Sequence, residues 1–108
     1  MMEESKALVI YVINKIFQQL QEDTREIKIA FNLVEYNDID IFLHTKRDDD
    51  ENSEISFTVE AIKHGTDEIY TNYVYNSSKE DLIEYIQTEK CSQKVLQCIT
   101  NLILKVRG

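Results

Sequence analysis

The fold is decided by residues 55–62, which read ISFTVEAI. Apolar side chains occupy every second position of this stretch. They are Ile55, Phe57, Val59 and Ala61. A period of two is typical of a β-strand, because successive side chains point to opposite faces of a sheet. The stretch therefore predicts a strand with one buried face, and its outward face carries Glu60 and Ile62.

The same alternation continues on both sides of this stretch. We predict further strands at residues 27–34, 39–44 and 68–75, although the Tyr- and Val-rich pattern of the last leaves its facing open. Turn-forming residues lie at 36–38 and 64–67, and residues 46–54 form a long polar loop. Short turns between consecutive strands favour an antiparallel meander.

Apolar residues at a spacing of three and four predict helices before and after the strands. The first covers residues 5–21, the second follows Asn76-Ser77-Ser78, and the last covers about residues 92–106. Ser77 with Glu80, and Ser78 with Asp81, are alternative registers of a capping box. The predicted fold class is α+β, a two-layer sandwich of order α-β-β-β-β-α-α in a single domain, residues 1–108.

The composition argues against several classes of function. The chain has 108 residues, 12 Lys plus Arg and 20 Asp plus Glu, a formal net charge of −8. Nucleic acids and anionic membranes are bound mainly through Lys and Arg, so direct binding to either is not expected. The longest apolar run, residues 7–13, is far shorter than the ~20 residues of a membrane span. The acidic N-terminus does not resemble a secretory signal, so we expect a cytoplasmic protein.

The acidic excess is concentrated in the predicted sheet. Residues 27–76 hold four basic and eleven acidic side chains, a net charge of −7. One interpretation is a solvated surface that keeps the protein soluble. The other is a docking surface for a basic protein, in which Phe42, Ile62 and the tyrosines of residues 70–75 are apolar anchors inside a charged rim. In a third interpretation, the sheet of a second copy of the chain covers this surface, which gives a homodimer.

On the docking interpretation, the partner-binding residues come from two strands and the polar loop between them. They are Asp40, Phe42, Asp48, Asp49, Asp50, Glu51, Glu54 and Glu60.

Motifs for catalysis, cofactors and metals are lacking. The Asp48–Glu51 run fails as an EF-hand loop, because Ser53 and Val59 occupy its glycine and glutamate positions. The two glycines, Gly65 and Gly108, cannot build a phosphate-binding loop. The histidines and cysteines are too scattered for a known zinc spacing. They are His44, His64, Cys91 and Cys98. We therefore expect no enzyme, no cofactor and no metal.

The cysteines are expected to be free thiols. Seven helical residues would separate Cys91 from Cys98 by roughly 10 Å, too far for a disulfide. Cys98 belongs to the apolar pattern of its helix and is expected in the core. Cys91 lies near a predicted helix start, where a lowered thiol pKa is a further hypothesis.

These observations favour a small acidic inhibitor that binds another protein. The leading hypothesis is an immunity protein that neutralises a bacterial toxin by covering a basic surface or active site. The alternatives are a phage or mobile-element inhibitor that mimics nucleic acid in a host enzyme, and a dimeric secretion or assembly chaperone. The sequence alone does not separate the first two, since both use the same acidic residues.

Overall fold

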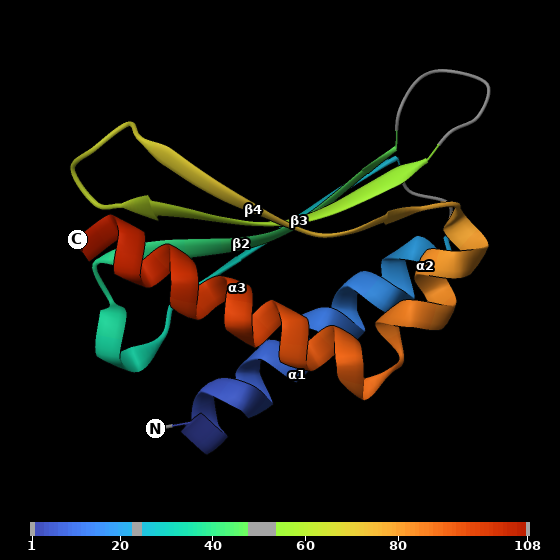
Figure 1. Ribbon diagram of the computed structural model, residues 1–108, viewed down its shortest axis with the longest axis horizontal. Coiled ribbons are helices and arrows are strands. Elements are labelled where there is room, and N and C mark those ends of the chain that lie inside the picture. Colours follow the sequence, from blue (N-terminus) through green and yellow to red (C-terminus); the bar gives the residue numbers. More distant parts are fainter. Residues whose placement is uncertain (1, 23–24, 48–53, 108) are drawn as a thin grey trace.

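The computed structural model describes residues 2–22, 25–47 and 54–107 (Figure 1). Within these residues the helices and strands follow the predicted order, with one short 3-10 helix added. They are α1 (Met2–Leu20), β1 (Glu26–Phe31), the 3-10 helix η1 (Val34–Tyr36), β2 (Ile39–Arg47), β3 (Ile55–Lys63), β4 (Ile69–Ser77), α2 (Lys79–Ile86) and α3 (Glu89–Arg107). None of the helices in this part of the chain is long and apolar enough to cross a membrane.

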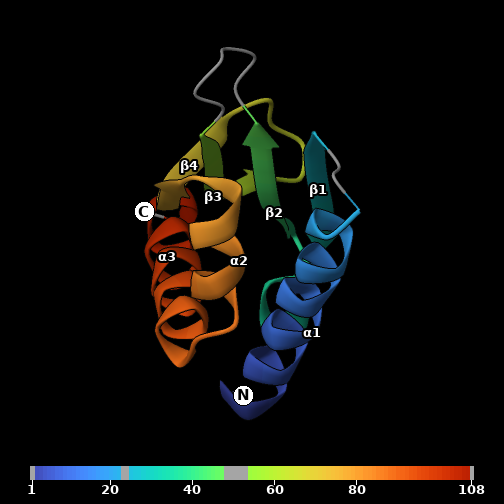
Figure 2. The ribbon, with the colours of Figure 1, turned by 90° about the vertical axis from the view of Figure 1, so that its right-hand side faces the viewer.

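The strands form one antiparallel sheet in the order β1-β2-β3-β4. The helices α1, α2 and α3 lie on the same side of it (Figure 1). Figure 2 shows α1 next to β1 and β2, with α2 and α3 next to β3 and β4. The predicted α+β sandwich of two layers is therefore confirmed.

The core lies between the helices and the sheet. Every second side chain of the central strands points into it, as the period of two predicts. These side chains are Ile39, Ile41 and Leu43 in β2, and Ile55, Phe57, Val59 and Ala61 in β3. Ile16 of α1 and Leu102 of α3 pack against them and are at most 1% exposed. Full burial of a side chain of this size contributes roughly 1.5–3 kcal/mol, so this layer contact is the main source of stability.

A β-bulge determines the facing of β4. Phe57 pairs with Tyr75, but the next residue, Thr58, pairs with Tyr73, so β4 holds one extra residue between them. Tyr75 therefore faces the helices, where its ring stacks on that of Tyr85 in α2 with centroids 3.9 Å apart. Tyr73 faces the other side of the sheet and is 70% exposed.

Side-chain caps place the starts of α2 and α3. The Asp81 N–H donates to Ser78 Oγ at 3.3 Å, which selects the second of the two predicted capping registers. The Cys91 N–H donates to Thr88 Oγ1 at 3.3 Å, so α3 begins at Glu89 and not at residue 92.

The connection from β1 to β2 differs from the prediction. β1 ends at Phe31, because Asn32 turns its side-chain amide toward β2 and donates to the Ile39 carbonyl at 2.9 Å. The chain then forms η1, with Leu33 buried and Val34 82% exposed. β2 continues beyond the predicted end to Arg47, since it pairs there with β1 and β3.

Candidate functional site

The sheet surface opposite the helices is the candidate functional surface, and we call it the open face. Cross-strand pairing sets its rows of side chains. One row is Lys28, His44, Thr58 and Tyr73, and the next is Ala30, Phe42, Glu60 and Thr71. Asp40, Ile62 and Ile69 form a third. Charged, aromatic and aliphatic side chains are thus mixed on one surface.

Four side chains at the centre of the open face form an ion-pair network, which we call the His44 cluster. Its members are Glu26, Lys28, His44 and Glu60. His44 Nδ1 lies 2.6 Å from Glu60 Oε2, and Nε2 lies 2.8 Å from Glu26 Oε2. Lys28 Nζ lies 3.4 Å from the other oxygen of Glu60. Each contact to a carboxylate needs an N–H donor, so the arrangement is complete when the imidazole carries both protons.

The cluster keeps both of its carboxyl groups ionised. Burial alone would raise the pKa of Glu60, which is only 8% exposed. The hydrogen bond and charge of His44, with the charge of Lys28, outweigh burial, and the pKa of Glu60 falls below its usual value. The hydrogen bond from His44 likewise lowers the pKa of Glu26. The cluster therefore places two ionised carboxylates against Lys28 and the two ring nitrogens of His44.

This network is not arranged as a metal centre. Both nitrogens of His44 already lie within hydrogen-bond distance of a carboxylate oxygen, so neither is directed toward a separate ion position. Among the described residues, no three His, Cys, Asp or Glu side chains could hold a metal ion.

A second carboxylate on the open face is also held by neighbours. Asp40 Oδ1 accepts hydrogen bonds from Asn32 Nδ2 at 2.7 Å and from His64 Nε2 at 2.9 Å. The His64 bond, followed by that of Asn32, lowers the pKa of Asp40. Asp40 is therefore an ionised acceptor held in a fixed orientation.

Apolar side chains surround these charges. Ile62 pairs across the strands with Ile69, which is 55% exposed, and Tyr73 lies further along β4. Phe42 is the cross-strand neighbour of Glu60. Lys28 Nζ lies 4.9 Å from the centre of the Phe42 ring. Large exposed apolar groups next to oriented charges can bury area in a complex and align a partner.

The structure brings together three of the predicted partner-binding residues. Asp40, Phe42 and Glu60 share the open face, in neighbouring positions of β2 and β3. Glu54 is exposed and precedes β3. Asp48, Asp49, Asp50 and Glu51 lie outside the described residues.

Sequence reasoning missed the residues that organise this surface. Sequence reasoning considered His44 only in the rejected zinc spacing, yet in the structure it joins two carboxylates, and Lys28 and Glu26 were not among the predicted site residues. Alternation along β2 puts His44 on the same face as Asp40 and Phe42, so part of the signal was present. The contact with Glu26 depends on the pairing of β1 with β2 and cannot be read from either strand alone.

The hypothesis of a lowered thiol pKa at Cys91 is wrong. The side chain is fully buried, and burial raises the pKa of this thiol to about 12. Cys98 lies in the core as predicted, and both cysteines are free. Neither thiol is poised for nucleophilic chemistry.

Comparison with known proteins finds no matching family model, no matching curated protein and no matching solved structure.

Proposed function

We propose that this protein is an inhibitor that binds a basic protein on its open face and blocks a working surface of that partner. The immunity-protein hypothesis, in which the partner is a bacterial toxin, is the specific form we favour. The observation that carries the proposal is the group Phe42, Ile62, Ile69 and Tyr73, which stands beside the His44 cluster on the face opposite the helices.

The composition of this surface supports protein binding. Tyr73 is 70% exposed and Ile69 is 55% exposed, so both offer apolar area to a partner. Aromatic anchors inside a polar rim provide most of the energy in many protein interfaces. The His44 cluster keeps the adjacent charges in fixed positions, which lowers the entropy lost on binding.

The charge of the chain supports a basic partner. Asp40 and Glu60 are paired internally and would act as oriented hydrogen-bond acceptors. The net charge of −8 acts at longer range and would speed the encounter with a cationic surface. A nucleic-acid mimic needs uncompensated negative charge on its contact surface, so the internal pairing of Asp40 and Glu60 favours the immunity-protein form over the nucleic-acid mimic.

The experiment compares two tyrosines of similar exposure on different surfaces. Tyr73 lies on the open face, and Tyr11, which is 58% exposed, lies on α1. Tagged wild type, Tyr73→Ala and Tyr11→Ala are used to capture proteins from a lysate of the native host at low salt, followed by quantitative mass spectrometry. We expect a basic protein that wild type and Tyr11→Ala retain and that Tyr73→Ala loses.

The captured protein is then purified and its activity is titrated with the wild-type chain. Inhibition that is complete at one equivalent supports the proposal. A partner that remains fully active in the complex contradicts the inhibitor function. A partner that Tyr73→Ala and Tyr11→Ala retain equally contradicts the open face as the binding surface, and so does a chain that captures only its own copies.

A further inference from the structure

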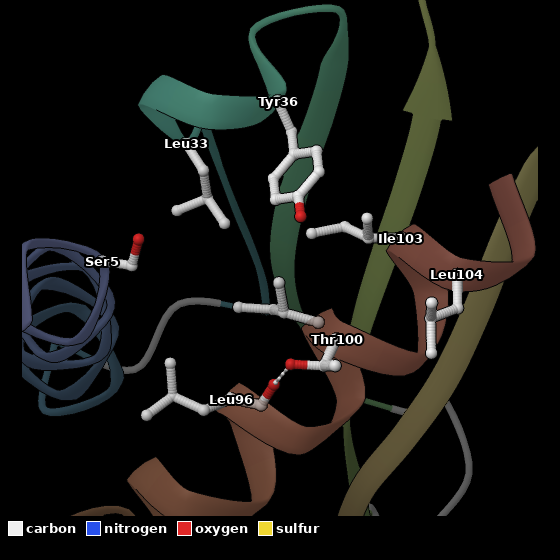
Figure 3. Close-up of a pocket in the computed structure, with 8 residues that line it drawn as sticks. Ser5, Leu33, Tyr36, Leu96, Thr100, Ile103 and Leu104 are labelled. Carbon is white, nitrogen blue, oxygen red and sulfur yellow. Dashed lines mark hydrogen bonds between the residues drawn. The ribbon is translucent and has the colours of Figure 1, made fainter. Parts of the chain in front are cut away.

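A cavity of about 170 Å³ lies on the helix side of the molecule, between α1, η1 and α3 (Figure 3). Its lining combines aliphatic side chains with three hydroxyl groups. The lining residues are Ser5, Leu33, Tyr36, Leu96, Ile99, Thr100, Ile103 and Leu104. This site is separate from the open face, and the proposed function does not use it.

Two of the three hydroxyl groups have no hydrogen-bond partner among the described residues. Ser5 is only 9% exposed, and it projects from α1 toward the cavity (Figure 3). The Tyr36 hydroxyl points from η1 toward Ile103 across the same space. Thr100 differs, because its hydroxyl donates to the Leu96 carbonyl at 3.0 Å. The hydroxyls of Ser5 and Tyr36 are therefore available to a bound molecule.

The charges near the cavity compensate one another. None of the described residues that line it carries a charge at neutral pH. The Arg107 guanidinium lies 5.0 Å from the centre of the Tyr36 ring and donates to Asp38 at 2.9 Å. This pair holds Tyr36 in place and leaves no excess charge for an ionic ligand. The chemistry of the cavity therefore selects a neutral molecule.

We propose that this cavity binds a small, uncharged aromatic compound that carries one hydroxyl or N–H group. The size is suitable, because a benzene ring fits an apolar protein cavity of about 150 Å³. This pocket differs from such a closed cavity in being open to solvent beside Leu104, which is 66% exposed. The ring would pack against the aliphatic walls of α3 and Leu33, while the polar group bonds to the hydroxyl of Ser5. Apolar walls with a few convergent polar groups are the usual design of a small-molecule site.

The test uses p-cresol as the probe, with toluene and 4-methylbenzoate as controls for its hydroxyl and for charge. Each is titrated into the full chain and followed by methyl NMR. We expect saturable shifts at Leu33, Leu96 and Ile103, with p-cresol binding roughly three- to tenfold tighter than toluene, the gain typical of one hydrogen bond. The charged 4-methylbenzoate should bind more weakly than either. Equal affinities for p-cresol and toluene, or shifts centred elsewhere, would overturn the proposal.

Variants of Ser5 locate the site. Ser5→Ala should reduce the preference for p-cresol over toluene, while Ser92→Ala, an equally buried serine whose hydroxyl already donates to the Glu89 carbonyl, should leave it unchanged. Ser5→Leu fills the cavity from α1, and Thr100→Leu fills it from α3. Thermal unfolding shows which of the two filled variants remains folded. A folded variant that still binds p-cresol with wild-type affinity would contradict the assignment.

Discussion

His44 Nδ1 lies 2.6 Å from Oε2 of Glu60, at the centre of the sheet face that is opposite the helices. Glu60 is only 8% exposed, and an ionised carboxylate at that depth is costly unless it is paired. Lys28 approaches its second oxygen at 3.4 Å, so both oxygens have partners. These two contacts explain how the buried carboxylate of Glu60 can be stable on the surface that we propose to be an interface.

Removal of His44 should destabilise the fold. The variant His44→Ala leaves Glu60 with Lys28 and the long hydrogen bond from Thr58 Oγ1, both at 3.4 Å. We expect a loss of about 1.5–3 kcal/mol, typical of a hydrogen bond to a charged group. The matched control is His64→Ala, whose pair with Asp40 is about half exposed and should contribute less than about 1 kcal/mol. Urea unfolding at pH 7 measures both. Equal losses for the two variants would contradict the special role of His44.

The His44 cluster should also make stability depend on pH in the acidic range. The pKa of Glu60 in the folded protein lies below its usual value of 4.5, which stands for the unfolded chain. Stabilisation is therefore complete above about pH 4.5 and is lost as the pH falls through the folded-state pKa. Unfolding measured between pH 7 and pH 3 should show this decrease in wild type. The decrease should be smaller in His44→Ala, and an identical pH profile would argue against the cluster as its source.

Both thiols should be unreactive in the folded protein. Cys91 has a pKa raised to about 12 by burial, and burial also raises the pKa of Cys98, so little thiolate is present at pH 8. We expect modification by a thiol-specific disulfide reagent to be as slow as opening of the fold, and fast in 6 M guanidinium chloride. Rapid modification of Cys91 in the native protein would show that the buried position is wrong.

Charge and contact should affect different steps of partner binding. Replacement of the sequence run Asp48, Asp49 and Asp50 by Lys weakens the long-range attraction, so association at low salt should slow at least roughly tenfold while dissociation changes little. Tyr73→Ala removes contact area and should instead speed dissociation, by roughly tenfold for an anchor residue. Surface plasmon resonance with the captured partner at two salt concentrations separates the two effects. If Tyr73→Ala slowed association and left dissociation unchanged, the assignment of Tyr73 to the contact surface would be wrong.

The layered fold could be predicted because alternation dominates the central strands. Ile55, Phe57 and Val59 share one parity, which places Glu60 and Ile62 on the opposite face without any knowledge of pairing. The same rule places Asp40 and Phe42 beside each other on β2. Three of the predicted partner-binding residues therefore belong to one surface.

The remaining features of the fold and of the candidate site depend on contacts between residues that are far apart in the sequence. The bulge in β4 changes parity between Tyr73 and Tyr75, so two tyrosines at a spacing of two face opposite sides. The contact of His44 with Glu26 requires the register between β1 and β2. The burial of Cys91 depends on how α3 packs against the rest of the fold. In each case the decisive neighbour is distant in sequence.

The most direct measurement is a methyl NMR map of the chain bound to the captured basic partner. Ile62 and Ile69 report on the open face, and Ile10 of α1 and Leu104 of α3 report on the helix side, where they are 38% and 66% exposed. The proposed function predicts that the signals of Ile62 and Ile69 shift or broaden on binding, while those of Ile10 and Leu104 stay in place. Changes confined to Ile10 and Leu104 would show that the partner binds the helices, and would contradict the open face as the functional surface.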